Sequence, residues 1–234
     1  MNKYKGKYFS ILGDSITTFE GVSEPKEGVF YDTSKKIASG VTTADKTWWG
    51  IVLKELGGKL LVNNSISGST VTGNSLFDYQ SYGCSDLRTS SLGADGVNPD
   101  IIIVYLGTND WGKGIKIRVE NSSDFEESNI FSNSYAIMLE KIKRNYPDAE
   151  VWCFTLATSF CSAVDSYEFP YYYNGIHILE YCESIRQNAK KYGCRLIELF
   201  SDIKPFDTFD GAHPNVDGMR TLADNILANL SHRD

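Results

Sequence analysis

The sequence is poor in the residues that build metal centres and disulfide frameworks. Among its 234 residues it holds 3 histidines and 5 cysteines. The cysteines are far apart and form no C-x-x-C pair, a pattern that favours free buried thiols in a reducing compartment over disulfides. The histidines and cysteines also show no metal-ligand spacing, so we expect no metal site. The cysteines are Cys84, Cys153, Cys161, Cys182 and Cys194.

Positive charge and long apolar stretches are scarce as well. Lys and Arg number 23 against 30 Asp and Glu, a net charge of −7, which argues against broad binding to nucleic acids or anionic membranes. No apolar run approaches the roughly 18–20 residues of a membrane span. The basic N-terminus leads straight into a strand pattern, without the apolar region of a signal peptide. We therefore expect a cytoplasmic protein, with secretion after removal of a signal segment as the alternative.

Strand and helix patterns alternate along the chain. Helical patterns cover residues 45–56, 131–146, 178–193 and 216–230, with Asp45 expected to cap the first. The strand pattern at 101–106 is apolar throughout, as in a parallel strand covered on both faces. This alternation predicts a parallel sheet with helices on both sides. Strands are predicted at 8–12, 60–66, 101–106, 151–156 and 195–199, and long loops at 18–44, 111–128 and 157–175.

The length suits one large α/β domain. Hydrophobic residues make up 41% of the chain and charged residues 23%, as is ordinary for soluble globular proteins. No internal repeat, low-complexity segment or linker interrupts the sequence. We predict a single domain over residues 1–234.

The segment Gly13-Asp14-Ser15 directly follows the first predicted strand. Ligands of open α/β sheets bind at the carboxyl ends of the strands. A glycine-permitted turn there can expose a serine hydroxyl as a nucleophile. Asp14 and Ser15 also suit the cap of a following helix, so both interpretations stay open at this point.

A serine nucleophile needs a base, and histidine is the natural one. His213 precedes the last helix, and Asp210, three residues earlier, can orient its imidazole. The same D-x-x-H pattern can also be a turn with a cap. His177 begins a predicted helix beside an aromatic segment, and His232 lies in the tail.

Two further strand ends offer hydrogen-bond donors for an oxyanion, which a tetrahedral intermediate requires. Gly68 has an unobstructed backbone N–H, and Asn109 has a side-chain amide. Each also has a plain structural interpretation, as a turn glycine and as an asparagine that ends a strand. In parallel strands, these segments and the Ser15 turn meet at one edge of the sheet.

Four segments in this order resemble the four blocks of the SGNH (GDSL-type) hydrolases. They are Gly13-Asp14-Ser15, Gly68, Gly-Thr-Asn-Asp at 107–110 and Asp-Gly-Ala-His at 210–213. The resemblance extends from residue 11 to about residue 218. It implies the SGNH hydrolase fold, a flavodoxin-like three-layer α/β/α sandwich with a five-stranded parallel sheet.

The resemblance also implies the roles of single residues. Ser15 would be the nucleophile, His213 the base and Asp210 the acid that orients it. The oxyanion hole would consist of the backbone N–H groups of Ser15 and Gly68 and the side chain of Asn109. No cofactor and no metal are implied. The rival α/β-hydrolase motif G-x-S-x-G is absent, as are phosphate-binding and dinucleotide-binding glycine motifs.

These observations predict a serine esterase that acts through an acyl-enzyme. Aromatic residues are frequent in the predicted loops and can stack on sugar rings, so we expect acetyl esters of carbohydrates as small-molecule or oligosaccharide substrates. The alternatives are a lipase or thioesterase for longer acyl chains, and a non-catalytic carbohydrate-binding protein. Candidate substrate contacts are Asp14, Trp111 and Tyr171, whereas Trp48 and Trp49 are expected to pack the first helix.

Overall fold

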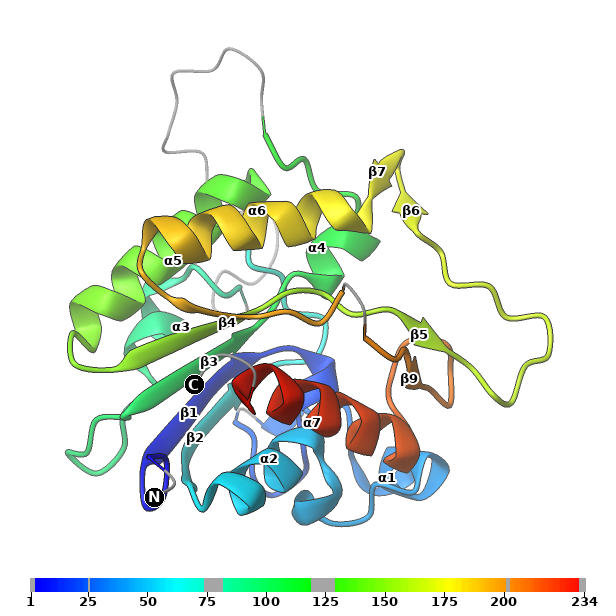
Figure 1. The fold of residues 1–234 in the computed structure, drawn as a ribbon, viewed down its shortest axis with the longest axis horizontal. Coiled ribbons are helices and arrows are strands. Elements are labelled where there is room, and N and C mark those ends of the chain that lie inside the picture. Colours follow the sequence, from blue (N-terminus) through cyan, green and yellow to red (C-terminus); the bar gives the residue numbers. More distant parts are fainter. Residues whose placement is uncertain (1–2, 25, 74–81, 119–128, 201–202, 232–234) are drawn as a thin grey trace.

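The computed structural model describes residues 3–24, 26–73, 82–118, 129–200 and 203–231. Within them, five strands form one parallel sheet in the order β2-β1-β3-β4-β8 (Figure 1). This arrangement confirms the predicted five-stranded parallel sheet. The strands are β1 (Tyr8–Gly13), β2 (Lys59–Ser65), β3 (Ile101–Tyr105), β4 (Glu150–Phe154) and β8 (Arg195–Ile197).

The strand order creates a switch point between β1 and β3. From β1 the chain proceeds to β2 on one side, and it later returns to β3 on the other. Gly13, the last residue of β1, is level with Ser65 of β2 and with Tyr105 of β3. The loops that follow these three strands therefore start side by side, at the edge where open α/β sheets bind ligands.

Helices cover both faces of the sheet (Figure 1). Helices α2 (Trp48–Leu56) and α7 (Val216–Ser231) pack on one face, and α5 (Phe131–Asn145) and α6 (Ile178–Lys191) on the other. Strand β3 is buried throughout, and its side chains alternate between the two cores. Ile103 belongs to the core under α2 and α7, whereas Ile102 belongs to the other. The predicted three-layer sandwich is thus confirmed.

Helix α2 begins three residues later than the sequence predicts. The Thr47 side chain accepts a hydrogen bond from the N–H of Gly50 and caps the helix at Trp48. Asp45, the predicted cap, lies instead in the 3₁₀ turn η3 (Ala44–Lys46). The helix core itself is as predicted, since Trp48 and Trp49 are both buried.

The predicted loop 18–44 is wrong in part, because it contains the 3₁₀ turn η2 (Lys26–Gly28) and the helix α1 (Thr33–Ser39). Helix α1 buries only Ser39, so it lacks the apolar stripe by which an amphipathic helix is found. Two other short helices are α3 (Asp86–Ser90), beside α5, and α4 (Thr108–Gly112), directly after β3. Of the predicted loop 111–128, residues 119–128 lie outside the described residues.

Short strand pairs organise the predicted loop 157–175. Strand β5 (Ser159–Phe160) pairs in parallel with β9 (Phe206–Asp207), just before the Asp210–His213 segment. Strands β6 (Tyr172–Tyr173) and β7 (Ile176–His177) form an antiparallel hairpin. In Figure 1 this hairpin projects beside α4 and the start of α6.

All five cysteines are free thiols, four of them buried and Cys194 half-buried, as the sequence predicts. Among the helices of the described ranges, none combines the length and the apolar character needed to cross a membrane.

Gly218 in α7 lies against the backbone of Asp207 in β9. A Cβ atom at this position would lie 1.9 Å from the Asp207 carbonyl oxygen, a backbone atom that cannot rotate away. We expect Gly218→Ala to destabilise the protein by at least about 2 kcal/mol and to lower Tm by about 4–8 °C. Gly112→Ala is the matched control, because its Cβ would meet no atom within 4 Å. Equal melting temperatures for the two variants would contradict this prediction.

Candidate active site

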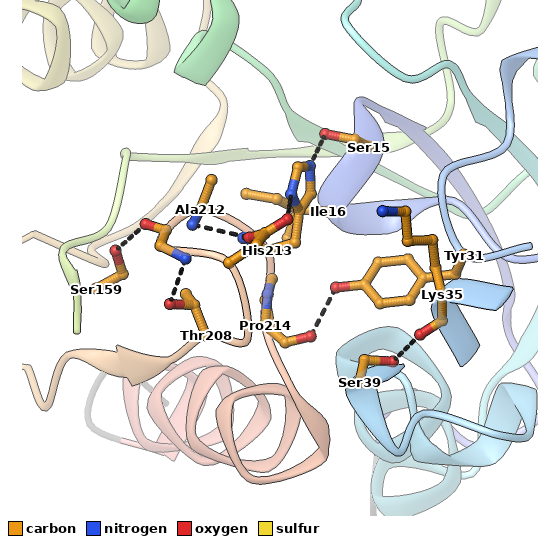
Figure 2. A network of polar contacts seen from close by, with 12 residues as sticks. Ser15, Ile16, Tyr31, Lys35, Ser39, Ser159, Thr208, Ala212, His213 and Pro214 are labelled. Atoms are coloured by element: carbon orange, nitrogen blue, oxygen red, sulfur yellow. Dashed lines mark hydrogen bonds and ion pairs between the residues drawn. The ribbon is translucent and has the colours of Figure 1, made fainter. Parts of the chain in front are cut away.

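Ser15 lies in a tight turn at the end of β1. The 3₁₀ turn η1 (Ser15–Thr17) starts directly after the strand, and the Asp14 carboxylate caps it by accepting a hydrogen bond from the N–H of Ile16. Asp14 is therefore a cap, and Ser15 is held by that capped turn. The Ser15 residue is 7% exposed, and its hydroxyl points toward His213 (Figure 2).

Three side chains form a continuous hydrogen-bonded relay. The Ser15 Oγ atom lies 2.9 Å from His213 Nε2, and His213 Nδ1 lies 2.8 Å from Asp210 Oδ2. The second carboxylate oxygen of Asp210 accepts hydrogen bonds from the N–H groups of Ala212 and His213, at 3.0 and 2.8 Å. The structure thus brings together the three residues predicted as a triad, in the order that a Ser-His-Asp site requires.

Aromatic side chains from the predicted loop 18–44 hold the histidine. The Phe30 ring stacks on the imidazole of His213, with centroids 3.5 Å apart and planes 15° from parallel. The Tyr31 hydroxyl donates to the carbonyl oxygen of Pro214 at 2.8 Å (Figure 2). The ammonium of Lys35 lies 5.4 Å from the Phe30 centroid. The imidazole is therefore fixed by packing as well as by its two hydrogen bonds.

The loop that carries Asp210 and His213 is tied down on its other side. The Thr208 hydroxyl donates to the Phe160 carbonyl at 2.7 Å and accepts from the N–H of Gly211 at 3.1 Å. The Tyr167 hydroxyl donates to the Gly211 carbonyl at 2.6 Å. The β5–β9 pair thus continues into hydrogen bonds that set the position of His213.

Burial and neighbouring charges shift the two titrating groups of the relay. Burial lowers the pKa of His213 below its usual 6.5, and the charge of Lys35 acts in the same direction, against the raising effect of Asp210. Burial alone would raise the pKa of Asp210. The N–H groups of His213 and Ala212 and the charge of the imidazole outweigh it, so this pKa lies below its usual value. At neutral pH the histidine is therefore mainly neutral and the aspartate ionised.

The turn after β2 starts beside the Ser15 turn, since Ser65 at the end of β2 is level with Gly13 at the end of β1. The N–H of Ser69 donates to the carbonyl of Ile66 at 3.1 Å, and Gly68 has a φ of +74°, a conformation that favours glycine. None of the described residues accepts a hydrogen bond from the Gly68 N–H. The sequence predicts this N–H as an oxyanion donor, and Gly68 stays a candidate for that role.

Asn109, at the start of α4, points its amide toward the same segment. Its Nδ2 atom donates to the Ser69 carbonyl at 2.9 Å and lies 3.5 Å from Asp14 Oδ2. The side chain therefore connects the loops that follow β1, β2 and β3. Its longer contact, to Asp14, is at the limit of hydrogen-bond geometry.

Two buried carboxyls lie beneath this surface. Burial raises the pKa of Asp14 to about 7, although the N–H of Ile16 and the charge of Arg88 oppose that rise. Burial likewise raises the pKa of Asp110 to about 6, against three hydrogen bonds from Val71 and Thr72. Asp14 is 2% exposed, so its position is that of a structural cap, which differs from the substrate contact that the sequence predicts.

The remaining predicted substrate residues lie in an aromatic cluster around α4. Trp111 is 5% exposed and stacks on Phe169, so it is part of the core and leaves no ring face for a substrate. Tyr171 is 46% exposed and stacks on His177. His177 caps α6 through its Nδ1 atom and does not join the relay. His232 lies outside the described residues.

Sequence reasoning missed Arg88, which is 1% exposed beneath the site. Its guanidinium donates to the carbonyl oxygen of Gly13 at 2.9 Å and also contacts Ser69. A single arginine in a polar segment carries no pattern that reveals such burial. Within the described ranges, no three His, Cys, Asp or Glu side chains lie close enough together to hold a metal ion.

Comparison with known proteins agrees with this geometry. The chain matches the GDSL-like lipase/acylhydrolase family over residues 7–167. It belongs to this family. Membership makes ester hydrolysis its class of activity, which the sequence predicts. A search of curated proteins found no significant match.

Solved GDSL structures share the whole fold. A protein described as a GDSL-like lipase from Bacteroides ovatus is 28% identical, with a TM-score of 0.73 over 97% of this chain and 99% of that one. A counterpart from Bacteroides uniformis is 27% identical, with a TM-score of 0.70 over 97% and 96%. A carbohydrate acetylesterase from Sinorhizobium meliloti is 14% identical, with a TM-score of 0.63 over 97% and 99%, and shares the fold.

The pKa of His213 in this GDSL-family protein can be measured by NMR titration of its imidazole. We expect a value below 6.5 in the wild type. Lys35→Gln should raise it by removing a nearby positive charge, and Asp210→Asn should lower it by about 1 unit or more by removing the opposite charge. Lys59→Gln, at the far end of the sheet, should leave it unchanged. A value above 6.5, or opposite shifts, would contradict this account.

Proposed function

We propose that the chain is a serine esterase that hydrolyses carboxylic esters through an acyl-enzyme. The observation that carries this proposal is the relay from Ser15 Oγ through His213 to Asp210, with successive distances of 2.9 and 2.8 Å. A serine hydroxyl is a weak nucleophile by itself, and a neutral imidazole at this distance can remove its proton as it attacks.

The steps follow from the geometry. Ser15 Oγ attacks the ester carbonyl while its proton moves to His213 Nε2. The Asp210 carboxylate, hydrogen-bonded to Nδ1, stabilises the imidazolium that forms. The imidazolium then gives the proton to the departing alcohol, and the acyl group remains on Ser15. Water, deprotonated by the same histidine, then attacks the acyl-enzyme. The bond between the acyl carbon and Ser15 Oγ breaks, the acid is released, and the imidazolium returns its proton to Ser15.

The charge that develops on the carbonyl oxygen needs fixed donors. We assign this role to the backbone N–H groups of Ser15 and Gly68 and to the Asn109 amide. Asn109 can exchange its 3.5 Å contact with Asp14 for a hydrogen bond to the oxyanion, because a contact of that length is at the limit of hydrogen-bond geometry.

For the substrate we infer acetyl esters of carbohydrates. An exposed aromatic surface, Tyr171–Tyr173, lies on the β6–β7 hairpin, and flat rings of this kind can stack on sugar rings. The hairpin turn adjoins the site, since Asn174 Nδ2 donates to the Lys113 carbonyl at 3.2 Å and Lys113 Nζ lies 3.5 Å from the Gly68 carbonyl. The structural relative from Sinorhizobium meliloti is a carbohydrate acetylesterase, which agrees with this inference.

The catalytic assignment is tested with 4-nitrophenyl esters from acetyl to palmitoyl. We expect highest activity on the acetyl ester, and Ser15→Ala or His213→Ala should lower turnover by several orders of magnitude, as losses from a triad do. Ser34→Ala, an exposed serine on α1, is the matched control and should keep full activity. Near-normal hydrolysis by Ser15→Ala would refute the mechanism. A preference for long chains would instead favour a lipase or thioesterase.

The oxyanion assignment predicts a separate effect for Asn109. Removing its amide with Asn109→Ala should lower kcat by roughly 10²–10³-fold with little change in KM, because the donor acts on charge that exists only in the transition state. Steady-state kinetics on the acetyl ester provide the measurement. A variant that changes only KM would contradict the assignment.

The substrate inference predicts that the tyrosine surface binds the sugar and not the acyl group. Tyr171→Ala and Tyr172→Ala should each raise KM for an acetylated oligosaccharide by about 3–10-fold, if stacking is worth the ~1 kcal/mol of other aromatic contacts. Hydrolysis of 4-nitrophenyl acetate should not change. Leu87→Ala, an exposed apolar residue on α3, is the control. Equal KM values on the oligosaccharide would exclude the hairpin from substrate binding.

A further inference from the structure

Arg88 is an almost completely buried cation at the ligand-binding edge of the sheet. It comes from the five-residue helix α3 and is 1% exposed. Arginine is rarely buried to this degree unless it is paired and hydrogen-bonded, because removing a charge from water is costly. The groups that accept hydrogen bonds from the guanidinium therefore indicate what Arg88 does in the fold.

The guanidinium binds three segments at once. Its Nη2 atom donates to the carbonyl oxygens of Gly13 and Asn64, at 2.9 and 2.7 Å, and Nε donates to Asn64 Oδ1 at 2.9 Å. Its Nη1 atom donates to the hydroxyl of Ser69. Arg88 thus connects the end of β1, the end of β2 and the turn that follows β2.

Two of these partners, Gly13 and Ser69, lie within two residues of a proposed oxyanion donor. Gly13 is two residues before Ser15, and Ser69 directly follows Gly68. The carbonyl of Ser69 in turn accepts the amide of Asn109 at 2.9 Å. Each of the three donors is therefore linked to a residue that Arg88 holds. Ser15 and Gly68 are linked along the chain, and Asn109 is linked through its hydrogen bond to Ser69.

The sheet itself does not fix these donors. The pairing of β1 with β2 ends at Gly13 and Ser65, and the pairing of β1 with β3 ends at Gly13 and Tyr105. Oxyanion donors need placement to within about 0.5 Å. Beyond the last paired residues, cross-links between the loops must supply that precision, and Arg88 provides two of them.

The chemistry of the site explains why the residue is an arginine. A planar guanidinium directs donors at several fixed angles, whereas a lysine ammonium is a compact point charge. Burial lowers the pKa of Arg88 to about 9, and the charge of Asp14 opposes that fall, so the side chain remains charged at neutral pH.

We propose that Arg88 is a positioning residue that holds the oxyanion hole in its reactive geometry, through Gly13 on one side and Ser69 on the other. This inference rests on the proposed serine-esterase function. Arg88 does not touch the substrate. It acts through the residues that carry the donors.

A comparison of two substrates separates this role from a general contribution to folding. An oxygen ester develops an oxyanion that accepts strong hydrogen bonds, whereas the matching thionoester develops its charge on sulfur, a weak acceptor. The ratio of kcat for the two substrates therefore measures the oxyanion hole. A loss of folded protein would lower both rates equally and leave the ratio unchanged.

The variants are Arg88→Lys, which keeps the charge but loses the planar fork, and Ser69→Ala, which removes one hydroxyl and leaves the arginine in place. We expect Arg88→Lys to lower kcat on the oxygen ester by roughly 10–100-fold and to lower the oxygen-to-thiono ratio by a similar factor. Ser69→Ala should lower the ratio by about 3–10-fold. Arg186→Lys is the control, because Arg186 pairs with Glu198 directly after β8, the strand at the opposite edge of the sheet from β2.

An unchanged ratio in folded Arg88→Lys or Ser69→Ala would overturn the positioning role, even if both variants melt at lower temperature. Should Arg88→Lys fail to fold, the Ser69→Ala ratio decides alone. Failure of the proposed function itself has a different signature, since wild-type protein would then show no Ser15-dependent hydrolysis of the oxygen ester.

Discussion

The hydrogen bond between Ser15 and His213 joins residues 198 positions apart, and much of the loop structure maintains it. The first partner follows β1 directly and is held in a turn that the Asp14 carboxylate caps. The second lies in a loop outside the sheet, so it depends on local contacts: the Phe30 ring on the imidazole, the Tyr31 hydroxyl on Pro214 and the β5–β9 pair behind them. Segments with little regular structure thus provide much of the rigidity around the histidine.

Buried ionisable side chains beneath the site hold the other loops in place. Arg88, Asp14 and Asp110 are all at least 98% buried, where each needs hydrogen bonds to be tolerated. Their partners lie at the ends of β1 and β2 and in the loops after β1, β2 and β3, so the hydrogen bonds to these groups also fix the loops relative to the sheet. The site therefore has two supports, an aromatic one around His213 and an ionic one under Ser15 and Asn109.

The sequence predicts the sheet and the relay well, because apolar strand runs and four short motifs mark backbone positions directly. It does not predict the features that depend on contacts between residues far apart in the sequence. The sequence predicts a loop at α1, because that helix has no apolar stripe. It predicts a substrate contact at Trp111, because the sequence does not say which neighbours cover a ring. Arg88 has no local signal, since its burial results from three segments that meet only in the folded chain.

The distance between Ser15 and His213 along the chain also has a consequence for protein synthesis. Ser15 precedes its base by 198 residues, so His213 is added long after the serine has emerged from the ribosome. The relay itself can form only after the segment that carries Asp210 and His213 has emerged, because a domain generally folds as a unit. Until that segment emerges, Ser15 has no base, so the nascent chain lacks the group that would activate its serine as a nucleophile.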